Sequence, residues 1–490
     1  MSEHPVKIPS LLLSLTPVLV LAGLLFVTIK LFGSDALEGG SQIVLLIATA
    51  VCCVIATVYC NVKWRAIEIA VVNNISGVAV ALFILLIIGA LSGSWMISGI
   101  VPTLIYYGMQ IIHPNIFLAS TCIICAVVSV MTGSSWTTIA TIGIALLGVG
   151  QAQGFPDAWI AGAIISGAYF GDKVSPLSDT TILSSSVTDT PLFTHIRYMM
   201  VTTIPSILIA IIIFTIAGFL HEPATTGQIV NYSASLQETF TISLWLLIVP
   251  VITGILIAKK APSVVTLFLA AALAGIFALF FQPDILQKIA GAEVQGAAAK
   301  FKGLLISFYG STHIETGNPA LNDLVSTSGM GGMMNTIWLI LCAMSFGGAM
   351  TASGMLGSIT SVFLRFMKRR ANMVASTVVS GIFLNVMTAD QYISILLTGN
   401  MFKNIYKQKG YESRLLSRTI EDGVTVTSPL VPWNTCGLTQ ATVLGVSTFT
   451  YLPYCFFNLI SPLMSIIVAV LGYKIYHTNE KEKDKNIVTG

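Results

Sequence analysis

The chain has 490 residues, of which 55% are hydrophobic and only 9% are charged. Soluble domains carry about 25% charged residues, so this composition excludes an ordinary soluble protein and indicates an integral membrane protein. The formal net charge of +3 is too small to indicate nucleic-acid binding. Many apolar runs approach the ~20 residues that a helix needs to cross a bilayer. We therefore expect an all-α polytopic membrane protein.

The first part of the chain predicts three spans. Residues 8–32 predict a first helix that is retained rather than removed as a signal peptide, and residues 42–60 predict a second. Lys63 and Arg65 flank Trp64, which favours an interfacial segment over 61–74 on the cytoplasmic side. Residues 77–99 predict a third span. No Asp, Glu, Lys or Arg occurs between Glu68 and Asp157, so charge is scarce in this region.

The pattern then becomes irregular. Two short apolar runs, 117–131 and 139–149, are joined by the polar sequence M-T-G-S-S-W-T-T. Such a pair predicts a re-entrant hairpin or a broken helix whose open backbone lines a cavity. A further short apolar run, 158–170, leads to G-D-K-V-S-P-L-S-D-T-T at 171–181. A carboxylate at membrane depth costs roughly 2.5 to 3.5 kcal/mol or more, so this stretch predicts an ion site in a transporter.

The rest of the chain also alternates apolar runs with polar segments. Residues 191–220 predict a long helix, 221–238 a polar loop, and 239–258 and 264–281 two plain spans. A long polar region, 282–335, precedes a span at 336–355 and a basic turn at 365–370. The apolar run 371–387 ends in M-T-A-D-Q-Y and is followed by a short apolar run at 393–402. Residues 451–473 predict the last span, before a charged tail.

An internal repeat is predicted by three motifs in the same order. Met131-Thr132 precedes Pro176 of S-P-L by 45 residues, and Met387-Thr388 precedes Pro429 of S-P-L by 42. The pattern F-T-x-x-x-Y follows at 193–198 and again at 449–454. Inverted repeats with broken helices are common in secondary transporters and hold substrate at the midplane. The predicted organisation is N-terminal helices (1–74), transport repeat 1 (75–220), a linker with two spans (221–330), transport repeat 2 (331–476) and a cytoplasmic tail (477–490).

The two repeats supply oxygen ligands, which a hard cation such as Na+ prefers. The first repeat offers Asp172, Ser175, Ser178, Asp179 and Thr180, with Thr132, Ser134 and Ser135 from the earlier break. The second offers Thr388, Asp390, Ser428, Asn434 and Thr435. We predict that Na+ is held by Asp179, Asp390 and Asn434. Nothing in the sequence indicates a cofactor.

Proton coupling requires an acid whose protonation competes with cation binding, and Asp172, Asp179 and Asp390 are the candidates. Structural alternatives remain open for each. Asp172 can pair with Lys173, and Asp179 and Asp390 can each cap a helix. Glu421 and Asp422 can pair with Arg414 or Arg418, and His195 can lie at headgroup level beside Arg197 or serve as a proton relay.

Enzymatic function is not indicated. Asp172 follows Tyr169-Phe170-Gly171, which lacks the first glycine of the G-x-G-D motif of aspartyl intramembrane proteases, and no H-E-x-x-H occurs. A passive channel is a further alternative, which pH-coupled exchange would exclude.

The segment 171–181, the following T-D-T-P-L-F-T-H-I-R-Y and the later T-A-D-Q-Y, T-S-P-L-V-P-W-N-T-C-G and Y-L-P-Y resemble the signature of NhaC-type sodium/proton antiporters. The resemblance covers about 75–475. It implies a bacterial inner-membrane antiporter with inverted repeats and re-entrant hairpins, which exchanges Na+ for H+ and contacts membrane lipid but no nucleic acid. The family's acidic motif falls on Asp172 and Asp179, and its second motif on Asp390, Ser428 and Asn434.

The same family includes exchangers that swap malate and protons for lactate and sodium. Sodium-coupled exchange of small carboxylates is therefore the alternative function, with Lys173 and Arg197 as candidate cations for a carboxylate. A homodimer is left open.

Overall fold

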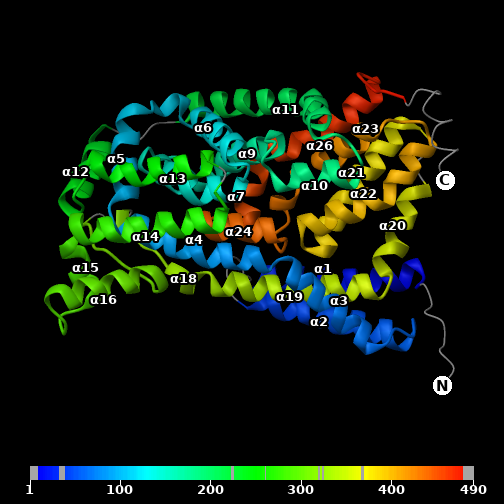
Figure 1. Ribbon diagram of the computed structural model, residues 1–490, viewed down its shortest axis with the longest axis horizontal. Helices are drawn as coiled ribbons and strands as arrows, with labels where there is room; N and C mark the ends of the chain where they lie inside the picture. Colours follow the sequence, from blue (N-terminus) through cyan, green and yellow to red (C-terminus); the bar gives the residue numbers. More distant parts are fainter. Residues whose placement is uncertain are drawn as a thin grey trace.

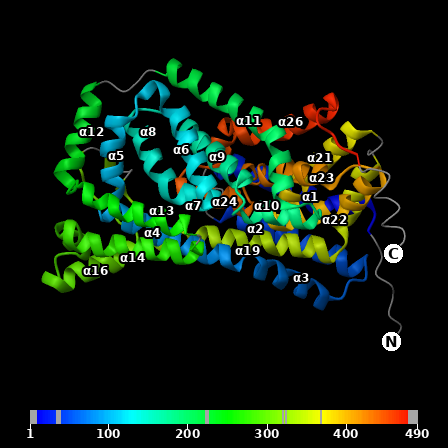
Figure 2. The same ribbon diagram turned by 45° about the horizontal axis from the view of Figure 1, so that its top comes forward.

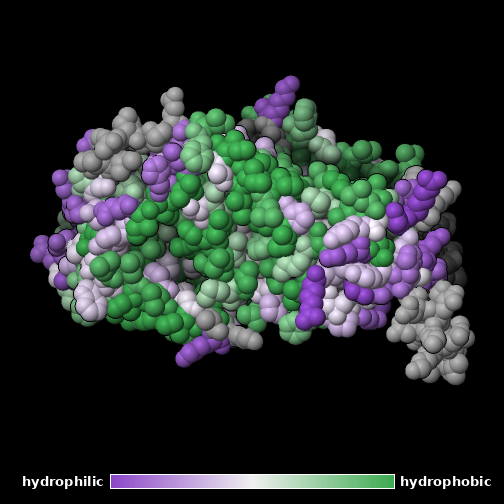
Figure 3. All heavy atoms as spheres, turned by 90° about the horizontal axis from the view of Figure 1, so that it is seen from above, coloured by the Kyte–Doolittle hydropathy of each residue, from purple (hydrophilic) through white to green (hydrophobic). Residues whose placement is uncertain are grey.

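The structure is a computed structural model that describes residues 9–32, 39–221, 226–259, 261–317, 321–322, 325–365 and 369–477. Helices dominate these residues, and the extended pairing within them is limited to two isolated bridges, Thr312 with Thr327 and Tyr411 with His477. Nine helices in the described ranges are long and apolar enough to cross a membrane, or up to 11 if each bent pair forms one span. Apolar side chains form a broad belt between more hydrophilic ends (Figure 3). The prediction of an all-α multi-pass membrane protein is confirmed.

The N-terminal helices pack against the start of the second half. They are α1 (Leu11–Phe32), α2 (Gly40–Val58), α3 (Trp64–Gly77) and α4 (Ala79–Ile97). The first and second match the predicted spans, whereas α3 is a full helix that a single residue, Val78, separates from α4. Helix α3 lies directly on α19 (Met334–Ala352), because a Cβ on Gly348 would lie 2.7 Å from the Cα of Val71.

The first predicted break is the tip of a re-entrant hairpin. After α5 (Ile100–Ile111) and η2 (Pro114–Ile116), α6 (Phe117–Thr132) ends at Gly133, and the chain returns through α7 (Ser135–Thr138), η3 (Ile139–Gly143) and α8 (Ile144–Ala152). Gln153 Nε2, just after α8, donates to Ile112 O at 2.8 Å, just before α6. The start of the first arm and the end of the second arm therefore lie side by side, as in a hairpin.

The second break is built in the same way. Helix α20 (Met355–Arg365) precedes α21 (Arg370–Thr388), which ends at Ala389 and is followed by α22 (Gln391–Gln408). The hydroxyls of Thr377, early in α21, and Tyr406, late in α22, lie 3.0 Å apart. The start of α21 and the end of α22 therefore lie side by side. Both predicted hairpins are present.

The two tips share one backbone geometry. Gly133 and Ala389 both adopt left-handed conformations, with φ of 66° and 57°. The hydroxyl of Thr132 accepts the N–H of Ser134 at 3.1 Å, and the hydroxyl of Thr388 accepts the N–H of Asp390 at 3.3 Å. The hairpins approach from opposite ends of the molecule, α6 from the end where α5 lies and α21 from the end where α20 lies (Figures 1 and 2). The expected inverted arrangement is confirmed, and the bounds of the repeats stay a prediction.

Each hairpin packs on a helix that leads to a second polar break. In the first half these helices are α9 (Asp157–Val174), α10 (Asp179–Val187) and α11 (Leu192–Leu220). A Cβ on Gly167 would lie 2.1 Å from Cys122 O, so glycine lets α9 touch the backbone of α6. The second half continues with α23 (Ser413–Ile420), η5 (Glu421–Thr425), η6 (Ser428–Leu430), α24 (Thr435–Leu444), α25 (Thr448–Tyr451), η7 (Leu452–Tyr454) and α26 (Phe456–Leu471).

Three predictions about the remaining spans are wrong. The expected polar loop 221–238 contains α12 (Thr226–Thr239), and the expected plain span 239–258 bends by 85° before η4 (Leu244–Leu247) and α13 (Ile248–Ala258). The side chain of Gln282 fixes this bend, because it accepts the N–H of Thr241 and donates to its carbonyl, both at 3.1 Å. The last span bends by 56° before α26.

Other regions agree with the sequence or lie outside the description. Helix α14 (Ser263–Phe281) matches its predicted span. The long polar region is partly helical, as α15 (Pro283–Ala290), α16 (Gly296–Tyr309) and α18 (Gly329–Gly332). The predicted tail lies outside the described residues from 478 onward.

Candidate functional site

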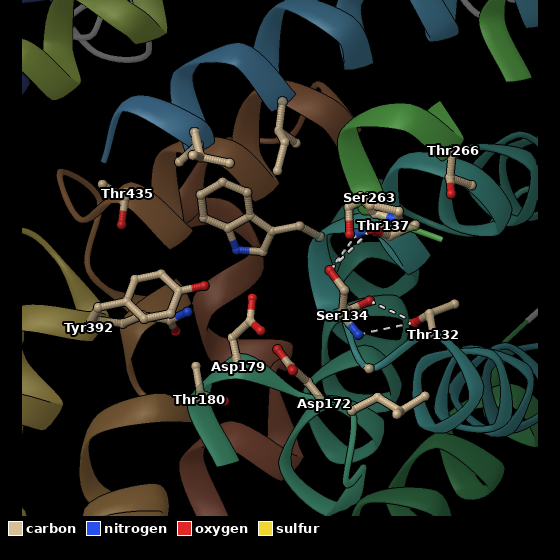
Figure 4. A pocket seen from close by; sticks show the side chains of 18 of the residues that line it. Thr132, Ser134, Thr137, Asp172, Asp179, Thr180, Ser263, Thr266, Tyr392 and Thr435 are labelled. Carbon is tan, nitrogen blue, oxygen red and sulfur yellow. Dashed lines mark hydrogen bonds between the residues drawn. The ribbon is translucent and has the colours of Figure 1, made fainter. Parts of the chain in front are cut away.

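A cavity of about 580 Å³ lies between the two hairpin tips, and we call it the central cavity. Seven of the predicted ligands line it: Thr132, Ser134, Asp172, Asp179, Thr180, Asp390 and Thr435. Figure 4 shows side chains from the first hairpin, the α9–α10 break and the second repeat around one space. The structure therefore brings together residues that lie more than 300 positions apart in the sequence, such as Thr132 and Thr435.

Asp172 is held by two serine hydroxyls. Its Oδ2 accepts Ser135 Oγ and its Oδ1 accepts Ser178 Oγ, both at 2.6 Å. The alternative of an ion pair with Lys173 is wrong, because Lys173 binds Asp422 instead. Neighbouring residues on a helix point about 100° apart, so α9 directs Asp172 into the central cavity and Lys173 away from it.

Asp179 is the first residue of α10, and Ser178 is the residue that caps this helix. The alternative that Asp179 is the cap is therefore wrong. Among the described residues, its carboxylate has no hydrogen-bond or ion-pair partner, and the residue is exposed to the central cavity. Figure 4 shows Asp179 beside Asp172 with both carboxylates directed into the cavity. This is the carboxylate that is most available to a ligand.

Asp390 combines two roles. Its Oδ1 accepts the N–H of Ile393 at 2.9 Å and so caps α22, as the structural alternative proposed. Its Oδ2 accepts the hydroxyl of Thr435 at 3.2 Å, and both residues line the central cavity. Asp390 therefore caps α22 and lines the cavity at the same time.

Five other predicted ligands do not line the central cavity. Ser135 and Ser178 reach it through Asp172, whereas Ser175 donates to Val130 O at 2.8 Å. Thr388 bonds within its own hairpin tip. Ser428 donates to the side-chain oxygen of Gln391 at 3.0 Å.

Asn434 does not line the central cavity. Its side-chain oxygen accepts the N–H of Cys436 at 3.0 Å, and its amide donates to Asn385 O at 3.1 Å. The residue caps α24 and ties it to α21, whereas its neighbour Thr435 lines the cavity.

Sequence reasoning missed part of the wall. Gln391 and Tyr392 follow Asp390 directly in T-A-D-Q-Y, so their position in that motif was a usable signal. Residues around the α3–α4 junction and the α13–α14 turn also contribute, together with Trp136 of α7: Gly77, Val78, Val80, Ala81, Ile84, Ile257, Ala261, Pro262, Ser263 and Thr266. Most of these residues are small or apolar and carry no chemical signal in the sequence.

The wall of the central cavity is acidic. Within the described part of the chain, no Lys, Arg or His lines it. Four helices, α7, α10, α22 and α24, begin at or beside the cavity, and the caps Ser134, Ser178, Asp390 and Asn434 each accept a first-turn amide of their own helix. Amides that are already bonded are less free to bind an anion. The described residues contain no group of three or more His, Cys, Asp or Glu arranged for a metal ion, so a cation here would need mixed carboxylate, hydroxyl and carbonyl ligands.

A second group of charges is fully buried beyond Asp172. Lys173 pairs with Asp422, and Arg418 Nε lies 3.8 Å from the other oxygen of Asp422. Of the pairings expected for Glu421 and Asp422, that of Asp422 with Arg418 is confirmed. Arg414 pairs with Glu412 instead, and Glu421 accepts the Ser184 hydroxyl. His195 is fully buried within the protein, and its Nδ1 lies 2.8 Å from Ser417 Oγ; its position at headgroup level stays a prediction.

Comparisons with known proteins identify the family of this chain. The Na+/H+ antiporter family matches residues 167–473. The chain is 38% identical to the Na+/H+ antiporter NhaC of Alkalihalophilus pseudofirmus, over 87% of this chain and 90% of that protein. It is 37% identical to the malate-2H+/Na+-lactate antiporter of Bacillus subtilis, over 85% and 86%. It is 34% identical to the arginine/ornithine antiporter ArcD of Halobacterium salinarum, over 98% and 95%.

Proposed function

Since this chain belongs to the Na+/H+ antiporter family, we propose that it exchanges Na+ for H+ across a membrane and that the cation binds in the central cavity. The observation that carries this proposal is the Asp179 carboxylate, which lines an acidic cavity without a partner among the described residues. A transporter of this family is not an enzyme, so the residues of the cavity bind and release ions rather than catalyse a reaction.

The chemistry of exchange follows from competition for one carboxylate. A protonated carboxyl is a poor ligand for Na+, and a bound Na+ opposes protonation of the same group. Asp172 already accepts two serine hydroxyls and Asp390 accepts an amide and a hydroxyl. Asp179 therefore has the largest free acceptor capacity, and Asp390, Thr180 and Thr435 can complete an oxygen shell around the ion.

Alternating access is proposed from the opposed hairpins. Each hairpin reaches the central cavity from a different end of the molecule, so a movement on one side can open the cavity to that side alone (Figures 1 and 2). Such exchange requires a sealed membrane with ion gradients, and we propose the cytoplasmic (inner) membrane of a bacterium.

A second candidate is sodium-coupled exchange of a small organic solute. The volume of about 580 Å³ exceeds what one Na+ needs and lies within the range of small-molecule pockets. Two relatives are named for malate and lactate or for arginine and ornithine. A carboxylate in this acidic wall would need accompanying cations, because the described lining residues offer no basic side chain.

A vesicle assay tests both candidates. The protein is reconstituted with a pH-sensitive dye inside, and Na+ is added outside. Sodium/proton exchange should raise the internal pH, whereas protein-free vesicles and a K+ addition should not. A response that needs malate, lactate or arginine would favour the second candidate. No response to Na+ under any of these conditions would contradict both.

A further inference from the structure

The proposed Na+/H+ exchange assigns no role to the buried charged residues beyond Asp172. We call Lys173, Arg418, Glu421, Asp422 and His195 the buried charge cluster, and all five are fully buried. Charged groups at membrane depth are expensive and are kept mainly where they act on ions or protons. The cluster lies where α9, α11, α23 and the π-helical turn η5 meet.

Helix α10 joins the cluster to the central cavity. Asp179 at its start lines the cavity. Thr181 donates to the carbonyl of Lys173 at 2.9 Å, and Ser184 donates to Glu421 Oε1 at 2.6 Å. Ser184 lies five residues after Asp179, which is a rise of about 7.5 Å along a helix. The same short helix therefore touches both the cavity and Glu421.

The two carboxylates of the cluster differ in their free capacity. Asp422 accepts Lys173, Thr202 and Ser461, so both of its oxygens have hydrogen-bond partners. Glu421 Oε2 has no partner among the described residues, although it is buried. The three guanidinium nitrogens of Arg418 also lack hydrogen-bond partners there, and this side chain packs on the Tyr198 ring at 4.7 Å. The cluster thus holds an open acceptor on Glu421 and open donors on Arg418.

The surroundings of Glu421 allow a change of charge. The charged and titratable side chains around its turn are Lys173 and Asp172 of α9, Arg418 of α23, His195 of α11 and Asp422 of the turn itself. Ser184 of α10, Asn385 of α21 and Ser461 of α26 contact the turn, whereas Tyr406 of α22 bonds Thr377 instead. Counting only Lys173, Arg418, Glu421 and Asp422, the charges balance when Glu421 is ionised, and one proton on Glu421 leaves a single net positive charge.

We propose that Glu421 is a second proton-binding carboxyl, separate from the carboxylates of the central cavity. The proton adds to Oε2 and leaves from it, and no other bond changes. Because Asp172 and Lys173 are adjacent on α9, a Na+ beside Asp172 and a proton on Glu421 oppose each other electrostatically. This inference rests on the proposed Na+/H+ exchange and assigns part of the proton binding to a different residue.

The experiment separates cation binding from proton coupling. Glu421→Gln is reconstituted, and two rates are measured: ²²Na+ counterflow between two Na+ solutions, and Na+-driven proton movement. The amide can still accept the Ser184 hydroxyl, so the fold should be kept. We expect counterflow within about twofold of wild type and at least a tenfold loss of proton movement. Glu421→Asp should recover part of that loss, because it restores a carboxyl.

Each other outcome has a definite meaning. Normal proton movement in Glu421→Gln would overturn the inference and leave the proposed function intact. Loss of counterflow together with proton movement would also overturn it, because Glu421 would then not be separable from cation binding. Absence of counterflow in the wild type would instead contradict the proposed function.

Ser184→Ala is the matched variant, since it keeps the carboxyl and removes the hydrogen bond from α10. We expect normal counterflow and a shifted pH for half-maximal proton movement, whereas an unchanged pH profile would contradict coupling through α10.

Discussion

At the scale of single residues, three carboxylates share one cavity but have different neighbours. Asp172 is bound by two serines, Asp390 caps a helix, and Asp179 has no partner among the described residues. The number of hydrogen bonds that each already accepts decides how much of it remains for an ion. Substitutions at these positions should therefore separate transport from stability in different ways.

Asp179→Asn should abolish Na+-dependent proton movement and leave stability unchanged. The charge is lost from the cavity, but no protein contact is broken. The measurements are the vesicle assay and the unfolding midpoint in detergent. Asp189→Asn is the control, because Asp189 is exposed and pairs with Lys403 at 2.6 Å. Normal exchange by Asp179→Asn would remove this residue from the mechanism.

Asp390 allows charge and capping to be separated. Asn caps helices about as well as Asp, while Ala costs roughly 1 kcal/mol. Asp390→Asn should therefore lose exchange with a nearly normal unfolding midpoint, and Asp390→Ala should lose both. The comparison of midpoints checks this, and equal midpoints for the two variants would argue against a capping role.

The identity of the acidic residues was predictable, but their partners were not. Asp172, Asp179 and Asp390 were recognisable because charged residues are rare in the apolar sequence around them. Lys173 and Asp422 are 249 residues apart, so no local pattern could indicate their pairing. For the same reason the sequence suggested Asp172 as the partner of Lys173, which is only its neighbour in the chain.

At the scale of elements, the two hairpin tips use the same turn with different residues. Gly133 and Ala389 are both left-handed, a conformation that glycine adopts without strain and alanine does not. The Cβ that Gly133 lacks would also lie 2.6 Å from the Cβ of Leu177. The first tip therefore has no space for a side chain at position 133, whereas Ala389 in the second tip has a modestly strained backbone.

Exchanging these residues should have opposite effects. Gly133→Ala should lower stability by about 1 to 2 kcal/mol or more, through strain and overlap with Leu177. Ala389→Gly should be neutral or slightly stabilising. Unfolding midpoints in detergent measure both, and a loss in Ala389→Gly as large as in Gly133→Ala would contradict this account.

Broken elements were predictable where the break is local. Thr, Gly and Ser between two short apolar runs indicated the first tip, and T-A-D-Q-Y indicated the second. The bend after α12 was missed because Gln282, more than 40 residues away in sequence, supplies its hydrogen bonds. Apolar composition alone cannot distinguish such a bend from a straight span.

At the scale of the whole molecule, the repeat predicted the meeting of the two halves. The duplicated motifs implied two opposed hairpins, and the structure joins them around one cavity. Which other segments close that cavity was not predictable, because the start of α4 and the α13–α14 turn contribute mainly small and apolar residues.

A cysteine in the cavity should report the bound cation. Leu177 lines the cavity, is half-buried and offers no ligand. In a background without the native cysteines, Leu177→Cys should react with a small maleimide, and saturating Na+ should slow that reaction severalfold. Phe193→Cys is the control, since Phe193 is 69% exposed and lies outside the cavity lining. Equal rates at Leu177→Cys with and without Na+ would place the ion elsewhere.

The wall that the α13–α14 turn adds to the cavity lies in the linker, outside both predicted repeats. Under the proposed function, substitutions on this side can therefore alter which cargo fits while the two hairpins stay unchanged. Antiporters named for a bare ion, a hydroxy acid or an amino acid can then descend from one scaffold, and grafting this wall between them is a direct way to transfer cargo preference.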